Sequence, residues 1–262
     1  MRTAIGQLFL TMLFPLLSPT GGQSSGLPAG QRTTVTVAAA ADLKFAMDSL
    51  AADFGKKNPG IDIKLIYGSS GNFFQQIGNG APFDLFFSAD MDYPRQLQAR
   101  GLTASVIRIY GTGQLVLWSR SFDPDIRKMD GLLDASVKKI AIANPAHAPY
   151  GRRAEEALRY FKLYDRVRDK LVLGENIAQT AQYAQSGAAD VAIIALSLAV
   201  SPAMQRSGGK YWLIPPASHQ TIEQGFVLLP HGKGNNGADR FMQYLSTPEA
   251  GAILKSFGFG RT

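Results

Sequence analysis

The alternation of apolar and polar positions divides this chain into strand-like and helix-like stretches that follow one another. Between residues 34 and 100, three apolar runs with strand character each precede a stretch with helical character. The expected strands are 34–41, 61–68 and 83–89, and the expected helices are 42–57, 70–79 and 91–100. This β-α-β-α-β order predicts an α/β fold with a mostly parallel sheet flanked by helices.

A second series of the same kind follows and indicates a second lobe. Its expected strands are 113–120, 138–145, 171–175, 189–197, 210–215 and 224–230, and the remaining helices are 151–163, 177–187, 237–246 and 248–256. The chain crosses between the two series near 110–116 and returns near 220–228, so the last two helices would complete the first lobe. We therefore predict lobe 1 at residues 31–112 plus 222–262 and lobe 2 at residues 113–221.

Ligands of such sheets bind beyond the carboxyl ends of the strands, where helices begin. Four junctions carry small or hydroxylated residues at the expected helix starts, namely "AAADL" at Asp42, "GSSGNF" at Ser70, "HAPYGRRAEE" at Tyr150 and "GENIAQT" at Ile177. A helix start presents unsatisfied N–H donors and about half a positive charge. About six hydrogen bonds to a charged group, at roughly 1.5–3 kcal/mol each, would allow micromolar binding of a compact oxyanion. Such a site needs no lysine or arginine.

The composition indicates a folded, exported protein. The chain has 262 residues, of which 45% are hydrophobic, and its 14 Pro and 27 Gly form no low-complexity tract. The absence of cysteine excludes a disulfide framework, thiolate metal sites, a catalytic thiol and a lipid-modified N-terminal cysteine. The net charge is +7, and the Lys and Arg residues that cause it are spread along the sequence. This distribution indicates a solvated basic surface, so we expect no nucleic-acid partner.

Residues 1–30 have the pattern of an export signal followed by a flexible segment. Arg2 precedes an apolar core at 4–18, and the small residues that follow would allow cleavage within about 20–31. Pro15 and the short apolar span disfavour a membrane anchor. We expect a periplasmic protein that is soluble after signal removal.

Three catalytic or cofactor patterns fail on inspection. The stretch "GSSGN" (68–72) lacks the final glycine of a nucleophile elbow. The histidines, His147, His219 and His231, lack metal-site spacing or a nearby acidic partner and are expected in loops. The stretch "GKGNNG" (232–237) matches a dinucleotide fingerprint, but too little chain follows it, so it is expected to cap the next helix. We predict no catalytic residue, no cofactor and no metal-cation ligand.

The sequence resembles the periplasmic molybdate-binding proteins of ABC importers. The resemblance covers roughly residues 33–260 and lies in "VTVAAAADLKFAM", "YGSSGNFFQQIGNGAPFDLFFSAD", "GQLVLWS", "IAIANPAHAPYGRRAEEAL" and the closing "FGF". It implies a type II periplasmic binding fold whose two lobes close on molybdate or tungstate through uncharged hydrogen bonds. It also implies a membrane permease as partner, and we expect a monomer.

The resemblance places the family's anion contacts on particular residues of this chain. The first falls on Ala41 and Asp42, where a serine or asparagine is more usual at the latter position. The others fall on Ser70 with Ser69 beside it, on Tyr150, and on the backbone N–H of Ile177. A further family tyrosine is replaced by Ala195, so Tyr150 would supply the phenol.

Asp42 leaves two interpretations open. Its carboxylate can cap its own helix by accepting the N–H of Lys44 or Phe45 and turn away from the ligand. Alternatively it accepts a hydrogen bond from a protonated oxyanion, which favours hydrogenphosphate, because a bare carboxylate repels a dianion strongly in a dry site.

The sequence thus predicts a binding protein for molybdate or tungstate that delivers its ligand to an ABC importer. A receptor for another tetrahedral oxyanion, phosphate first, is the alternative within the same class. An exported hydrolase that uses Ser70 or Asp42 is the alternative from another class. It would require a histidine or a second carboxylate near those residues, for example His147 within hydrogen-bond reach of Ser70.

Overall fold

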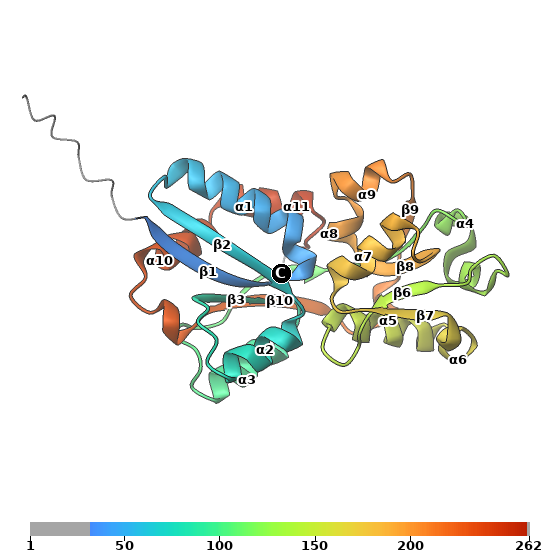
Figure 1. Cartoon of the computed structure of the whole chain (residues 1–262), viewed down its shortest axis with the longest axis horizontal. Helices are drawn as coiled ribbons and strands as arrows, with labels where there is room; N and C mark the ends of the chain where they lie inside the picture. Colours follow the sequence, from blue (N-terminus) through green and yellow to red (C-terminus); the bar gives the residue numbers. More distant parts are fainter. Residues whose placement is uncertain (1–31, 261–262) are drawn as a thin grey trace, which may run out of the picture. The chain divides into compact units, whose positions relative to one another are not determined.

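The computed structural model describes residues 32–260, and the predicted export signal lies outside this range. None of the helices in that range combines the length and the apolar character needed to cross a bilayer. Figure 1 shows the described chain built around two separate β-sheets, each covered by helices.

The first sheet contains five strands in the order β2-β1-β3-β10-β4. These strands are β1 (Thr33–Ala40), β2 (Ile61–Gly68), β3 (Leu85–Ser88), β4 (Arg108–Gly113) and β10 (Ile222–Leu228). Side chains of β1 alternate between its two faces, as a strand requires. Val35 and Val37 pack with the helices α1 (Lys44–Lys57), α10 (Asn236–Tyr244) and α11 (Pro248–Ser256). Ala38 packs on the other face with α2 (Ser70–Gly78) and α3 (Asp92–Ala99).

The second sheet has the order β7-β6-β8-β5-β9. Its strands are β5 (Leu115–Ser119), β6 (Ile140–Ala143), β7 (Leu171–Gly174), β8 (Val191–Ala195) and β9 (Lys210–Leu213). The helices around it are α4 (Pro124–Arg127), α5 (Pro149–Tyr160), α6 (Tyr164–Val167), α7 (Ile177–Ser186), α8 (Leu196–Ala199) and α9 (Pro202–Arg206). We call the parts built on the first and the second sheet the first lobe and the second lobe.

Both sheets are mixed, and each contains one reversed strand. In the first sheet β1 pairs in parallel with β2 and β3, whereas β10 pairs antiparallel with β3 and β4. In the second sheet β6 pairs in parallel with β7 and β8, whereas β5 pairs antiparallel with β8 and β9. Four strands of each sheet therefore run in one direction. The predicted α/β fold with two lobes is confirmed, and its sheets are less purely parallel than the β-α-β series suggested.

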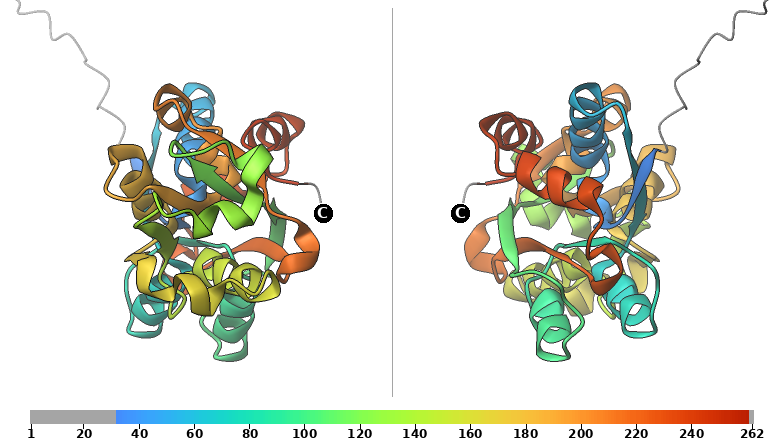
Figure 2. Two further views of the ribbon diagram at one scale, coloured as in Figure 1. Left: turned by 90° about the vertical axis from the view of Figure 1, so that its right-hand side faces the viewer. Right: turned by 90° about the vertical axis from the view of Figure 1, so that its left-hand side faces the viewer.

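The reversed strands, β5 and β10, are the first strands that the chain forms after each crossing between the lobes. β4 and β5 are separated by Gln114 alone, so the chain leaves one sheet and enters the other without a loop. It returns through residues 214–221 into β10. After that return, α10 and α11 lie beside β1 and α1 from the opposite end of the sequence (Figure 2).

The predicted helices and strands are present, and their boundaries differ for local reasons. The helix expected at 42–57 begins with a 3-10 turn at Ala41–Leu43 before α1 starts at Lys44. The helix expected from residue 151 begins at Pro149, because proline is well suited to the first helical position. Asn235 caps α10, as expected for the "GKGNNG" loop. The short helices α4, α6, α8 and α9 span only four or five residues, too few for a helical period to appear in the sequence.

Candidate functional site

The four predicted helix starts converge on one small cavity between the lobes. The cavity is lined by Ala40, Ala41, Asp42, Gly68, Ser69, Ser70, Ala89, Ala148, Pro149, Tyr150 and Ile177. All five residues predicted to contact an oxyanion are among them. The cavity measures about 10 Å³, which is the room of roughly one water molecule, so it must widen to admit a tetrahedral oxyanion.

The first helix start owes its close packing to its alanines. Ala40 and Ala41 are buried at the end of β1, where larger side chains would keep the second lobe away. The hydroxyl of Ser197, at the start of α8, donates to the backbone carbonyl of Asp42 over 2.7 Å. The second lobe therefore contacts the main chain of this turn directly.

The second helix start presents two buried serines. Ser69 caps α2 by accepting the backbone N–H of Asn72. Ser70 accepts the backbone N–H of Ala89 on its hydroxyl oxygen at 3.0 Å, which leaves the hydroxyl hydrogen to donate elsewhere. The next residue, Gly71, donates its N–H to the carbonyl of His147 in the second lobe over 2.9 Å.

The other two helix starts come from the second lobe. Pro149 opens α5 and places Tyr150 in its first turn. Asn176 caps α7 by accepting the N–H groups of Ala178 and Gln179 on its side chain. The N–H of Ile177, at the first helical position, stays outside that cap and belongs to a residue that lines the cavity.

The side chain of Asp42 does not cap its own helix, so the first of the two interpretations left open for it is wrong. Neither the 3-10 turn nor α1 has a side-chain cap. Asp42 is 1% exposed, and its Oδ2 accepts hydrogen bonds from the Tyr150 hydroxyl at 3.1 Å and from Gln224 Nε2 at 2.8 Å. Its Oδ1 is buried and has no hydrogen-bond partner in the described part of the chain. Two donors in this fixed arrangement hold the carboxylate better than the local cap would.

Burial changes the acidity of this group strongly. Loss of solvation raises the pKa of Asp42 to about 7, although the hydrogen bonds from Gln224 and Tyr150 oppose the rise. Burial also raises the pKa of Tyr150 well above its usual value of 10, and the negative charge of Asp42 adds to this effect. The phenol is therefore neutral near pH 7, and its proton points toward Asp42.

Gln224 is a site residue that the sequence analysis missed. It is fully buried on β10, where its Nε2 donates to Asp42 and lies 3.0 Å from the Tyr150 oxygen. Its Oε1 accepts from the Tyr110 hydroxyl at 2.6 Å. The available signal was a glutamine at the start of the apolar stretch "QGFVLLP", since a buried amide requires partners.

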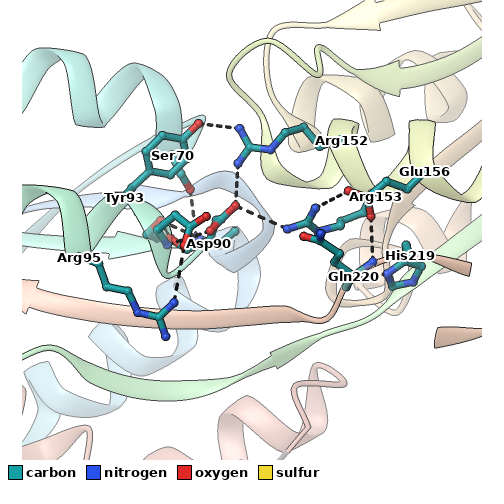
Figure 3. Close-up of polar contacts among 12 residues, drawn as sticks. Ser70, Asp90, Tyr93, Arg95, Arg152, Arg153, Glu156, His219 and Gln220 are labelled. Carbon is teal, nitrogen blue, oxygen red and sulfur yellow. Dashed lines mark hydrogen bonds and ion pairs between the residues drawn. The ribbon is translucent and has the colours of Figure 1, made fainter. Parts of the chain in front are cut away.

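Beside the cavity, polar side chains of the two lobes form a cluster, which Figure 3 shows. Arg152, from α5, donates to Asp90 over 2.6 Å and to the Tyr93 hydroxyl over 2.9 Å. Arg153 lies 3.7 Å from the same Asp90 carboxylate, and both residues are 8% exposed. The expectation that the basic residues form a solvated surface does not hold for these two arginines. Both arginines are instead paired with Asp90 of the first lobe.

His147 also has partners that its sequence neighbourhood did not indicate. Its Nδ1 lies 2.9 Å from Ser69 Oγ, and its Nε2 lies 3.7 Å from Glu175 Oε2. The hydrolase interpretation required His147 beside Ser70, and the structure places it beside Ser69 instead. His231 likewise lies 2.8 Å from Asp84. Within residues 32–260, no group of three or more His, Cys, Asp or Glu side chains is arranged to hold a metal ion.

Comparison with known proteins gives one consistent result. A family profile described as "Bacterial extracellular solute-binding protein" matches residues 35–260. The chain is 36% identical to the molybdate-binding protein ModA of Azotobacter vinelandii over 235 residues, which is 88% of this chain and 92% of that protein. It is 33% identical to ModA of Rhodobacter capsulatus over 227 residues, which is 86% of this chain and 87% of that protein. The solved structure of the Azotobacter vinelandii periplasmic molybdate-binding protein superposes with a TM-score of 0.80 at 30% identity, and the match covers 87% and 99% of the two chains.

Proposed function

This chain belongs to the bacterial extracellular solute-binding proteins, and we propose that it captures molybdate or tungstate and delivers it to the membrane permease of an ABC importer. The observation that carries the proposal is the convergence of four helix starts on one cavity between two lobes. No lysine or arginine is among the residues that line this cavity in the described chain. Its hydrogen-bond donors are therefore uncharged N–H groups and hydroxyls. Donors of this kind can bind a dehydrated oxyanion.

The proposal assigns the anion contacts to both lobes. The N–H groups of Ala41 and Asp42 and the hydroxyl of Ser70 contribute from the first lobe. Tyr150 and the N–H of Ile177 contribute from the second lobe. We take the first lobe as residues 31–112 plus 222–262 and the second as 113–221. Because the contacts are divided in this way, a bound anion stabilises the closed state, which the permease can recognise.

We further propose that the ligand is cargo and not a cofactor or substrate, and that the protein works as a periplasmic monomer without a nucleic-acid partner. Discrimination from sulfate rests on the size of the widened cavity and the positions of its donors, because charge and shape are the same. Export through the signal at residues 1–30 is part of the same proposal.

The contacts of His147 keep a hydrolase as the second candidate. Ser69, His147 and Glu175 follow one another at 2.9 and 3.7 Å, which resembles a nucleophile, a base and an orienting acid. However, Ser69 already accepts the N–H of Asn72, and it faces a cavity with room for about one water. Hydrolysis of p-nitrophenyl acetate that Ser69→Ala abolishes would support the hydrolase; equal background rates for both proteins would exclude it.

Titration calorimetry with four anions tests the main proposal. We expect molybdate and tungstate to bind with a Kd at or below the micromolar range, which corresponds to about −8 kcal/mol or better. Sulfate and phosphate serve as matched tetrahedral controls and are expected to bind much more weakly. No heat of binding with molybdate or tungstate would contradict the proposal. Tight binding of phosphate alone would favour the other oxyanion receptor.

Tyr150→Phe tests the phenol at the site. Removal of the hydroxyl leaves Oδ2 of Asp42 with Gln224 as its remaining side-chain donor. We expect molybdate binding to weaken by about 1–3 kcal/mol, which is the usual loss for a buried hydrogen bond to a charged group. Tyr160→Phe is the control, because that tyrosine lies exposed at the far end of α5. Equal affinities of Tyr150→Phe and the unmodified protein would remove the phenol from the site.

A further inference from the structure

The carboxylate of Asp42 uses only one of its two oxygens within the protein. Oδ2 accepts from Tyr150 and Gln224, whereas Oδ1 is buried without a partner in the described chain. Asp42 lines the cavity on which the helix starts converge. Since Oδ2 already accepts two hydrogen bonds, Oδ1 is the oxygen that remains to contact a ligand in the cavity.

The charge of Asp42 decides what Oδ1 can do. An ionised carboxylate only accepts hydrogen bonds, and a fully deprotonated anion also only accepts them. Two such groups in contact repel each other strongly when they are shielded from water. A single proton between them removes this conflict and converts the repulsion into a charge-assisted hydrogen bond.

Resting on the proposed function, we propose that the site takes up one proton with each fully deprotonated tetrahedral dianion, and that Asp42 Oδ1 and the facing anion oxygen share it. The proton comes from solvent and no covalent bond changes. Asp42 then acts as a neutral donor, in the role that a serine or an asparagine side chain can fill without a proton. Gln224 keeps Oδ2 as an acceptor when the Tyr150 hydroxyl turns from Asp42 to the anion, so Oδ1 carries the proton.

The groups around Asp42 permit this protonation near neutral pH. Burial raises the pKa of Asp42 to about 7 in the free protein, and a dianion beside it would raise the pKa further. The phenols of Tyr150 and Tyr110 face it from α5 and β4, and burial holds the pKa of each well above 10. From α7 and α8, the neighbouring Ile177 and Ser197 carry no charge.

The charged side chains near the cavity are paired with other groups. Lys44, on α1, lies 3.7 Å from Asp48, and Arg152, on α5, pairs with Asp90. His147 contacts Ser69 and not Asp42. Because its side chain lies against Ser69 beside the cavity, His147 is tested separately.

The shared proton distinguishes two classes of anion. Molybdate, tungstate and sulfate lack a proton and must acquire one from solvent at this site. Hydrogenphosphate carries its own proton, which it can donate to the ionised Oδ1. The pH dependence of affinity above pH 7 therefore reports the class of the ligand as well as the state of Asp42.

Calorimetry of molybdate binding between pH 6 and pH 9 tests the inference, with proton uptake measured in buffers of different ionisation enthalpy. We expect the Kd to rise about tenfold for each pH unit above 7, with uptake approaching one proton per anion at pH 8. In Asp42→Asn the amide nitrogen donates permanently, so affinity should be flat across this range and proton uptake absent. Asp62→Asn removes an exposed carboxylate on β2, and His147→Gln removes the imidazole; both should keep the slope and the uptake.

Tight binding at pH 8 without proton uptake would overturn the inference and leave the proposed function standing. The same holds if Asp42→Asn keeps the pH slope of the unmodified protein, or if His147→Gln loses it. Absence of molybdate and tungstate binding at pH 6 and at pH 8 would overturn the inference and the proposed function together.

Discussion

Gly71→Ala is expected to weaken molybdate binding about 100-fold while leaving each lobe folded. A Cβ at this position would lie 2.5 Å from the carbonyl oxygen and 2.9 Å from the Cα of His147 in the second lobe. Overpacking of this kind costs about 1–3 kcal/mol, and displacement of His147 also loses the Gly71 hydrogen bond, worth about 1 kcal/mol. Since the contact forms only when the lobes meet, the substitution acts as a wedge that opposes closure.

The wedge can be distinguished from damage to the helix. Alanine is more favourable than glycine inside a helix by about 1 kcal/mol, so α2 itself should not be weakened. Gly251→Ala on α11 is the matched control, because a Cβ there has nothing within 4 Å. Small-angle scattering with saturating molybdate should show incomplete compaction for Gly71→Ala and normal compaction for Gly251→Ala. If Gly71→Ala binds molybdate as tightly as the unmodified protein does, closure of the lobes does not need this close approach.

The sequence was sufficient for the fold because the fold follows local rules. Each expected strand and helix exists, since apolar periodicity and Gly, Pro and Asn boundaries act over a few residues. Convergence of residues 42, 70, 150 and 177 also followed from a general rule, because helix starts gather beyond the carboxyl ends of strands in such sheets. The resemblance to molybdate-binding proteins then selected these four junctions from the others.

What the sequence could not give are the contacts that form between the lobes. Ser69 and His147 are 78 positions apart, and Asp90 and Arg152 are 62 apart, so no local pattern joins either pair. The interpretation of the Asp42 side chain as a helix cap was wrong for the same reason. Its local option was a helix cap, and two donors from distant elements, Tyr150 and Gln224, outcompeted it. Interlobe contacts depend on how the two lobes close on each other, which periodicity does not encode.

Asp42→Asn is expected to raise the free energy of unfolding at pH 8 by up to about 4 kcal/mol. The pKa of Asp42 rises from 3.8 to about 7 on folding, and each pKa unit corresponds to about 1.4 kcal/mol. Because folding raises the pKa of this acid, Asp42 does not lower the free energy of unfolding below pH 3.8. The free energy of unfolding then falls between pH 4 and 7, and the full cost of the ionised Asp42 is reached above pH 7. Asparagine does not titrate, so the difference between the two proteins should be small at pH 4 and largest above pH 7.

Chemical unfolding at pH 4, 6 and 8 measures this difference, and the location of Asp42 between the lobes determines how it is interpreted. Parting of the lobes would return the ionised carboxylate to water and release part of the strain without unfolding. The unmodified protein should then scatter as a more open particle at pH 8 than at pH 5, whereas Asp42→Asn should not change. If neither the unfolding free energy nor the scattering differs between the two proteins at pH 8, the buried carboxylate is not under electrostatic strain. The ionised form would then be accommodated by its two donors, Tyr150 and Gln224, and the proton would have no part in closing the lobes.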